Sequence, residues 1–191
     1  KNQGDGITLA RAIKLSEDII KQLRDCCPDI KSMEVVGSIR RMEETIDDIN
    51  LVCVTTDMRQ VVDVFVKLTN VDRVVNQADR KVSVMIENEL QANLMIVDKD
   101  NFGSAMQYFT GDQQHSVGLK DRALEKGFVL SEYGLKSLDS GKTQCFNSEN
   151  LLYERLGMQF IPPELRQGID EINLAIGNKL PCLVDVKALR G

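Results

Sequence analysis

Hydrophobic residues in the first third of the chain recur first with the period of a helix and then with the pattern of strands. Residues 7–26 carry apolar side chains at helical spacing, and Pro28 follows as a stop. Residues 33–36 and 49–54 are rich in β-branched side chains, which favour extended structure. We therefore predict a helix with one buried face followed by two neighbouring strands.

The next segment continues the alternation of helix and strand. Asp57 is placed to cap a helix over residues 58–68. Alternation or β-branching predicts further strands over 71–76, 81–87 and 90–97. Together these elements predict a small mixed sheet backed by helices.

The pattern changes near residue 100, where we place a subdomain boundary. Helical spacing returns over residues 102–109, a turn follows at Thr110-Gly111, and a second helix runs through Leu119 and Leu124. Short strands are predicted around 128–130 and 133–136, a polar turn at 137–141 and a helix at 148–156. An irregular region is predicted from Pro162 onward. The fold class that this order predicts is α+β.

Composition and charge describe an ordinary globular chain with an acidic balance. Of 191 residues, 42% are hydrophobic and 28% charged, and the net charge is −5. The first 100 residues carry 14 basic and 18 acidic side chains. Binding to nucleic acid phosphates normally requires clustered cations, so this balance argues against a strong nonspecific grip on nucleic acid.

Other classes are disfavoured by what the chain lacks. No apolar run reaches the roughly 18 to 20 residues that span a membrane, and the first residues do not resemble a signal peptide, so a cytoplasmic location is expected. Five cysteines and a single histidine, His115, show no paired ligand spacing, which disfavours a zinc site or a disulfide framework.

The chemistry of the sequence is concentrated in Gly37-Ser38 and, nine residues later, Asp48-Ile49-Asn50. Residues i and i+2 of a strand face one side, so Asp48 and Asn50 point together. A Gly-Ser pair that opens a helix offers amides and a hydroxyl to an anion, and two arginines follow it. The group could hold a metal-bound triphosphate. The alternative is an ordinary turn, with Arg40 and Arg41 paired to Glu43, Glu44 or Asp47.

Ordered motifs along the whole chain resemble the bacterial and archaeal family X DNA polymerases, relatives of DNA polymerase beta. Residues 37–50 resemble their nucleotidyltransferase signature, and residues 91–94 resemble the strand that carries their third carboxylate. Further resemblance lies at Tyr108-Phe109-Thr110-Gly111 and at 132–135, 153–157 and 161–166. The match begins near Ile7 and continues to the end of the sequence.

This resemblance implies a nucleotidyltransferase-type palm at residues 1–100, a smaller α+β thumb at 101–181 and a linker at 182–191 toward a further domain. It places Asp48, Asn50 and Asn93 at the catalytic, metal-binding positions. It also implies a contact to DNA from Lys120. The nucleotide-binding positions that it implies are Gly37, Ser38, Arg41, Tyr108, Phe109, Gly111, Asp112 and Ser116.

The resemblance also implies partners and a reaction. These are magnesium or manganese, deoxynucleotides and gapped or primed DNA, used in gap-filling repair with two-metal displacement chemistry. Larger members carry a helix-hairpin-helix module before this region, and many carry a PHP phosphoesterase domain after it. Neither domain is present in this sequence, so missing flanking domains are expected.

Several positions depart from the family pattern. Asn50 and Asn93 stand where the family has aspartate, and one charge pair at about 4 Å is worth on the order of 4 kcal/mol at an effective dielectric near 20. Weakened metal binding is therefore expected. Further departures favour natural divergence over an engineered inactivation: Gly6, Asp47, Met95, Asp112 and Ser116 replace an arginine, a glycine, an arginine, a serine and an asparagine.

Three functions fit the sequence. The first is a family X polymerase core that fills short gaps with magnesium or manganese held by Asp48 and the two amides, with catalysis impaired by the missing carboxylates. The second is a non-catalytic module that docks DNA or serves as a scaffold for a phosphoesterase domain. The third is a nucleotidyltransferase acting on a small molecule or a protein, which the thumb motifs after Phe102 disfavour.

Overall fold

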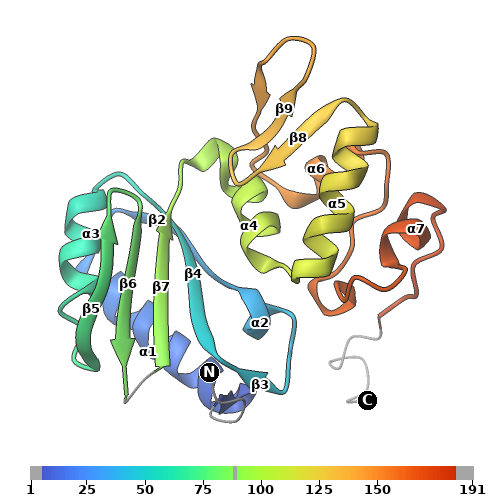
Figure 1. The fold of residues 1–191 in the computed structure, drawn as a ribbon. Helices are drawn as coiled ribbons and strands as arrows, with labels where there is room; N and C mark the ends of the chain where they lie inside the picture. The colour runs from blue at the N-terminus through green and yellow to red at the C-terminus, as the bar shows by residue number, and fades with distance from the viewer. Residues whose placement is uncertain (1–5, 88–89, 184–191) are drawn as a thin grey trace, which may run out of the picture.

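The computed structural model describes residues 6–87 and 90–183, which form two subdomains side by side (Figure 1). The first subdomain is built on a five-stranded mixed sheet. Its strands, in spatial order, are β2 (Ile30–Val36), β4 (Asp48–Thr55), β7 (Leu90–Ile96), β6 (Lys81–Ile86) and β5 (Val71–Ala78). β4 and β7 are parallel, whereas the other neighbouring pairs are antiparallel.

Alternating side chains divide this sheet into two faces. Helices α1 (Leu9–Cys26) and α3 (Met58–Phe65) cover one face, where Ile49 and Leu51 of β4 belong to the largest hydrophobic core. The Asp57 carboxylate caps α3 by accepting a hydrogen bond from the backbone nitrogen of Gln60 at 2.9 Å. The other face is partly covered by α4 (Phe102–Thr110), which packs on a second core that includes Val52 and Met95.

Three short elements lie at the end of the sheet where β4 begins. β1 (Ile7–Thr8) pairs antiparallel with β3 (Thr45–Ile46), and the four-residue helix α2 (Gly37–Arg40) follows β2 directly. Ile46 and Ile39 are both buried, so this end of the sheet is held by apolar packing as well as by backbone hydrogen bonds.

The second subdomain combines helices with a small antiparallel sheet, ordered β10, β9, β8. Its elements are η1 (Lys99–Asn101), α4, α5 (Gln113–Glu125), β8 (Phe128–Ser131), β9 (Gly134–Ser137), β10 (Thr143–Gln144), α6 (Glu149–Arg155), η2 (Pro163–Leu165) and α7 (Glu171–Ile176). A separate core of buried side chains, among them Leu119, Leu135 and Tyr153, joins these elements.

The predicted α+β class, with a mixed sheet backed by helices, is confirmed. The predicted helix over 7–26 was wrong at its start, because residues 7 and 8 form a strand. The irregular region predicted from Pro162 contains α7, and the predictions omitted β3 and β10. No helix in the described part of the chain is long and apolar enough to cross a membrane.

The domain boundaries stay a prediction. The division near residue 100 falls at η1, and α4 beyond it packs both on β4 and on α6. Most of the linker expected at 182–191 lies outside the described residues.

Candidate active site

Asp48, Asn50 and Asn93 meet on the face of the sheet that is turned away from α1 and α3. β4 and β7 run parallel with Asn50 opposite Asn93, and Asp48 lies two residues before Asn50 on the same side of its strand. Ile49 and Ala92 between them point into the core on the other face. The pattern of alternating side chains therefore brings together three residues that are far apart in the chain.

Hydrogen bonds connect these three side chains. The Asn50 Nδ2 donates to Asp48 Oδ1 at 2.9 Å, and the Asn93 Nδ2 faces Asp48 Oδ2 at 3.4 Å. Asn93 Nδ2 also donates to Asn50 Oδ1 at 3.0 Å. Each oxygen of the one carboxylate thus faces an amide N–H group.

Neighbouring strands fix the orientation of Asn93. Its Oδ1 accepts hydrogen bonds from Ser83 Oγ at 2.6 Å and from Gln91 Nε2 at 2.8 Å. Asn93 and Ser83 are both buried. Because its oxygen is occupied on the far side, Asn93 presents its NH₂ group to Asp48.

A cleft of about 400 Å³ opens beside these side chains, between the palm-like sheet and the start of α5. Most of the predicted nucleotide-binding residues line it, together with acidic neighbours. The lining residues used below are Gly37, Ser38, Arg41, Glu43, Asp47, Asp48, Asn50, Phe109, Thr110, Gly111, Asp112 and Ser116. Asn93 lies behind Asp48 and Asn50 and does not line the cleft itself.

Gly37 forms the tight junction between β2 and the cleft. Its φ of 71° is in the left-handed region, and a Cβ built on it would lie 3.0 Å from Asn50 Nδ2. Glycine therefore allows α2 to begin directly beside the Asn50 side chain, with Ser38 at the cleft wall.

The two arginines after Ser38 are already engaged. Arg41 forms an ion pair with Glu43 and donates to the backbone oxygen of Thr110. Arg40 donates to Thr110 Oγ1 at 2.7 Å and forms a 2.5 Å ion pair with Glu149. The alternative interpretation paired both arginines with Glu43, Glu44 or Asp47. It is confirmed for Arg41, which pairs with Glu43, and wrong for Arg40, which pairs with Glu149 of α6.

Glu149 belongs to a buried network that joins the two subdomains. Arg166, which is fully buried, forms an ion pair with Glu149 at 2.8 Å. Burial raises the pKa of Glu149, but hydrogen bonds and charge from Arg40 and Arg166 outweigh it and hold that pKa below its ordinary value. Glu149 is therefore a carboxylate at neutral pH and holds two cations.

His115 is fully buried in the second subdomain, and its ring is neutral at pH 7. Burial lowers the pKa of His115 despite the nearby Glu171 carboxylate. The ring lies 2.8 Å from Glu171 through Nδ1 and 3.0 Å from the Tyr153 hydroxyl through Nε2. In the neutral tautomer that suits both partners, Nδ1–H donates to Glu171 and Nε2 accepts from Tyr153.

Asp112 and Ser116 form hydrogen bonds at the N-terminus of α5. The Asp112 carboxylate caps this helix by accepting from the backbone nitrogen of His115 at 2.7 Å, and the Ser116 hydroxyl donates to the Asp112 carbonyl at 2.6 Å. The charges around the cleft are thus one cation, Arg41, against four carboxylates. Such a lining opposes the binding of an anionic triphosphate.

Two predicted contact residues lie outside this cleft. The Lys120 Nζ lies 5.3 Å from the centroid of the Tyr108 ring, so these two residues contact each other. Met95, where the resemblance implied an arginine, is buried in the core under α4. A Cβ on Gly6 would lie 2.4 Å from Thr45 Cγ2, so a side chain has no room there.

The donor set does not fit a pair of divalent metals. Magnesium and calcium require oxygen ligands and favour carboxylates, whereas two of the three side chains here are amides whose N–H groups point at the third. Within residues 6–87 and 90–183, no group of three or more histidine, cysteine or acidic side chains could hold a metal ion.

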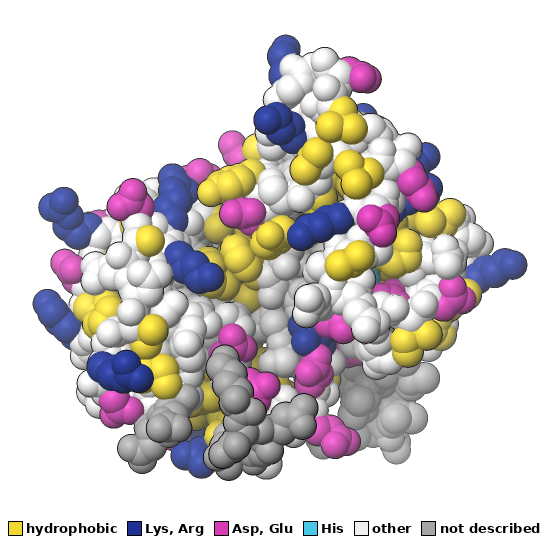
Figure 2. Space-filling model, viewed as in Figure 1, with side chains coloured by type: hydrophobic (Ala, Val, Ile, Leu, Met, Phe, Trp, Pro, Cys, Tyr) yellow, Lys and Arg dark blue, Asp and Glu magenta, His cyan; other side chains and the backbone are white. Residues whose placement is uncertain are grey.

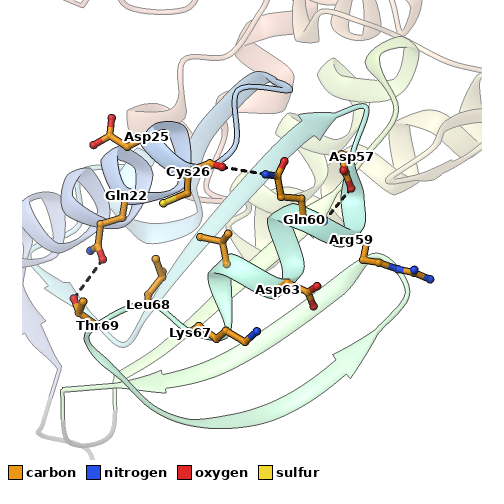
Figure 3. Close-up of a pocket in the computed structure, with 11 residues that line it drawn as sticks. Gln22, Asp25, Cys26, Asp57, Arg59, Gln60, Asp63, Lys67, Leu68 and Thr69 are labelled. Atoms are coloured by element: carbon orange, nitrogen blue, oxygen red, sulfur yellow. Dashed lines mark hydrogen bonds between the residues drawn. The ribbon is translucent and has the colours of Figure 1, made fainter.

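A larger cavity lies away from this chemistry. About 670 Å³ in volume, it is located between α1 and α3, and Gln22, Asp25, Arg59 and Lys67 are among its lining residues (Figure 3). Figure 3 shows the Gln22 side chain hydrogen-bonded to Thr69, and none of these side chains belongs to the group at Asp48. Its size alone therefore does not mark it as the functional site.

Sequence reasoning missed four partners that shape the candidate site: Ser83, Gln91, Thr110 and Glu149. Gln91 could have been found, since it lies two residues before Asn93 on the same strand face. Ser83 pairs directly with Asn93 across β6 and β7. Glu149 is 109 residues from Arg40, and no local pattern connects them.

The sheet with Asp48 at the start of its strand β4, the cleft beside it and the helical subdomain beyond it together define a nucleotidyltransferase-type palm followed by a thumb. Residues 105–167 match the family described as DNA polymerase beta thumb. The chain is 29% identical over 172 residues to the DNA polymerase/3'-5' exonuclease PolX of Bacillus subtilis (strain 168). That alignment covers 89% of this chain and 30% of the Bacillus protein.

The chain is therefore related to the family X DNA polymerases. It spans about 30% of the length of the relative that it matches.

Proposed function

We propose that this chain is a palm and thumb module that docks on DNA and is strongly impaired in nucleotidyl transfer. One observation carries the proposal: both oxygens of Asp48, the single carboxylate of the expected metal group, face amide donors at 2.9 and 3.4 Å. The amide protons occupy the positions from which cations would neutralise that charge.

The cost of this arrangement follows from charge. Each aspartate that is replaced by asparagine removes a charge worth on the order of 4 kcal/mol to a cation at about 4 Å, at an effective dielectric near 20. After discounting for solvent, two such losses correspond to several orders of magnitude in metal affinity or rate, since about 1.4 kcal/mol is tenfold. The acidic cleft adds a further cost for a bound triphosphate.

The relationship to DNA polymerases supports the DNA-docking part of the proposal. It implies DNA and nucleotide as partners and, in general, a divalent metal requirement. The thumb fold is intact, with its own buried core and a charged network to the palm. A shape suited to gapped or primed DNA can therefore persist without the metal group. A role in DNA repair and a cytoplasmic location follow as parts of this proposal.

Placing aspartate at positions 50 and 93 tests whether the two asparagines cause the proposed impairment. The double variant Asn50→Asp with Asn93→Asp should gain template-directed extension of gapped DNA in magnesium or manganese, by at least about tenfold for each charge restored. The matched control is Asn76→Asp with Asn147→Asp, which makes the same charge change at exposed positions. Extension by the unmodified protein at a rate equal to that of the restored variant would refute the impairment.

If the double variant binds metal but still does not extend gapped DNA, a second cause of impairment would lie at Asp47, Met95 or Asp112. Titration with gapped DNA at low salt tests docking separately. If no complex forms, the acidic cleft excludes DNA, and the remaining role is a scaffold for other domains such as a phosphoesterase.

A further inference from the structure

A groove in the thumb, distinct from the cleft at Asp48, has a positively charged lining. Its volume is about 500 Å³, and its lining residues come from the C-terminal ends of α5 and α6, the small sheet and the turn between β9 and β10. Figure 2 shows Lys and Arg side chains over this small sheet, at the top of the view. The charged residues that line the groove are Lys126, Lys142, Arg155 and Asp139. Three cations therefore outnumber one carboxylate here, although the whole chain has a net charge of −5.

These three cations have no counter-ion in the structure. Within residues 6–87 and 90–183, none of them forms an ion pair, with Asp139 or with any other carboxylate. Lys126 and Arg155 stand at the C-terminal ends of α5 and α6, where the helix dipole favours a cation. Lys142 lies in a turn between two strands, so no helix dipole accounts for it. An anion bound in the groove would relieve the repulsion among the three.

Arg155 is held in one orientation by its neighbours. Its guanidinium carbon lies 4.5 Å from the centroid of the Phe128 ring, and its Nε donates to Gln144 Oε1 at 3.2 Å. Its two Nη groups donate no hydrogen bond to any other residue that the structure describes. The planar edge of a guanidinium suits the oxygens of a phosphate, and an arginine that is already stacked loses little freedom when it binds one.

Hydroxyl groups add further donors to the groove. Ser137 and Ser140 both line it. The Ser137 Oγ accepts from the backbone nitrogen of Ser140 at 3.2 Å, and the Ser140 Oγ accepts from that of Lys142 at 3.4 Å. Neither hydroxyl donates a hydrogen bond within the described part of the chain, so each keeps a proton for an external acceptor. The groove thus presents ammonium, guanidinium and hydroxyl donors together.

We propose that this groove binds the phosphate groups of a nucleic acid strand. A phosphodiester carries a negative charge and only acceptor oxygens, so it complements the cations and hydroxyls of the groove. Asp139 opposes such a ligand, but the three cations exceed it. The identity of the strand rests on the DNA docking proposed above, to which the groove adds a second contact.

Helix α5 separates the groove from the cleft at Asp48. Asp112 at the N-terminus of α5 lines the cleft, and Lys126 at its C-terminus lines the groove. The helix has 13 residues, which at a rise of about 1.5 Å per residue corresponds to about 20 Å. This length equals about six nucleotide steps of B-DNA at about 3.4 Å each. A strand that extends about six nucleotides beyond the cleft is therefore long enough to reach the groove.

The salt dependence of binding tests the groove. A labelled single-stranded oligonucleotide of about eight nucleotides is titrated by fluorescence anisotropy at several salt concentrations. In the double variant Lys126→Ala with Lys142→Ala, the slope of the logarithm of the association constant against the logarithm of salt concentration should fall in magnitude by about 1.4. Each phosphate contact to a single strand contributes about 0.7 to that slope. The loss should be equal for oligo-dA and oligo-dT, since phosphate contacts do not read sequence.

The matched control is Lys136→Ala with Lys179→Ala. It removes the same charge from exposed positions of the same subdomain that do not line the groove. The slope should change by less than half as much as in the groove variant. Asp139→Asn has the opposite expectation: it removes the one opposing charge in the groove and should tighten binding.

A parallel titration with gapped DNA distinguishes failure of the groove from failure of DNA docking. Oligonucleotide binding that the groove variant weakens, without a complex with gapped DNA, would support the groove and contradict docking on gaps. A gapped-DNA complex with the same salt slope in both double variants, together with equal oligonucleotide slopes, would overturn the groove alone. Binding of a glutamate peptide as tightly as an oligonucleotide of equal charge would overturn the assignment to phosphate. Absence of a complex with either DNA would overturn both proposals.

Discussion

An amide and a carboxylate have nearly the same size and shape, so the packing around Asn50 and Asn93 gives little indication of which one a position holds. The hydrogen bonds give the answer instead. The Asn93 oxygen accepts hydrogen bonds from Ser83 and Gln91. Its NH₂ group donates to Asp48 and Asn50 on the other side. A single NH₂ group in place of an oxygen turns a site that would attract cations into one that satisfies its own carboxylate.

Gly37 is predicted to be indispensable to the geometry of this group. Gly37→Ala places a side chain at a φ of 71° and 3.0 Å from Asn50 Nδ2, so it should lower the free energy of unfolding by about 2 kcal/mol or more. Gly127→Ala is the matched control, because its φ is 79° and nothing lies within 4 Å of the new methyl group. Urea denaturation measures both, and equal losses would show that contact with Asn50 is harmless.

The convergence of Asp48, Asn50 and Asn93 could be predicted from the sequence, because strand periodicity and an ordered resemblance both pointed there. The pair of Arg41 with Glu43 was also among the alternatives that the sequence offered, whereas the partner of Arg40 was not. Arg40 is paired with Glu149 across 109 positions, and only the packing of α2 on α4 and of α4 on α6 brings them together. An arginine that follows a Gly-Ser turn in the sequence is therefore not necessarily free to bind a phosphate.

At the scale of elements, a buried carboxylate on α6 connects the palm to the thumb. Glu149 lies between Arg40 of α2 and Arg166 beyond η2, and Arg166 also lies against the Tyr153 and Phe160 rings at 5.4 and 5.6 Å. Removing one partner of such a group leaves the others charged and out of water, which costs more than the contact itself contributes.

Glu149→Ala should accordingly lower the free energy of unfolding by about 3 to 5 kcal/mol. The pair of Arg122 with the exposed Glu125, at 3.0 Å, provides the comparison, and Glu125→Ala should cost about 1 kcal/mol or less. Both values come from urea denaturation. A loss below about 1 kcal/mol for Glu149→Ala would mean that the network does not stabilise the fold.

Long elements were predicted well and short ones were not. The sheet strands and α1 have several turns or alternations to establish a period, whereas β1, β3 and β10 have two residues each. α7 has six residues and follows a segment with two prolines. Its Ala175 is fully buried in the thumb core, so tertiary packing rather than local propensity holds it.

At the scale of the whole molecule, stability should depend on the protonation of His115. The pKa of this buried ring is lowered from 6.5, so below about pH 6.5 the unfolded chain binds more protons than the folded protein. Stability should therefore fall as pH falls from 7 to 5, by up to about 1.4 kcal/mol per pH unit. The groups that face the ring are Glu171, Asp112, Arg166 and Tyr153.

His115→Gln should flatten this dependence, because the replacement does not titrate. Glu149 and Glu171 also have lowered pKa values, so their contribution is lost only as pH falls below about 4.5. Thermal unfolding of both proteins between pH 5 and pH 7 separates the two ranges. Parallel curves for the two proteins would exclude His115 as the source.

The hydrogen bonds from Ser83 and Gln91 to Asn93 bear on how this chain can evolve. Both donors would suit a carboxylate at that position as well as they suit the amide oxygen. Asparagine and aspartate codons differ by one base, so one base change at each position would introduce a carboxylate that these donors can hold. Two such substitutions would rebuild the carboxylate group on an unchanged sheet, and any further obstacle would then lie in the cleft rather than in the framework.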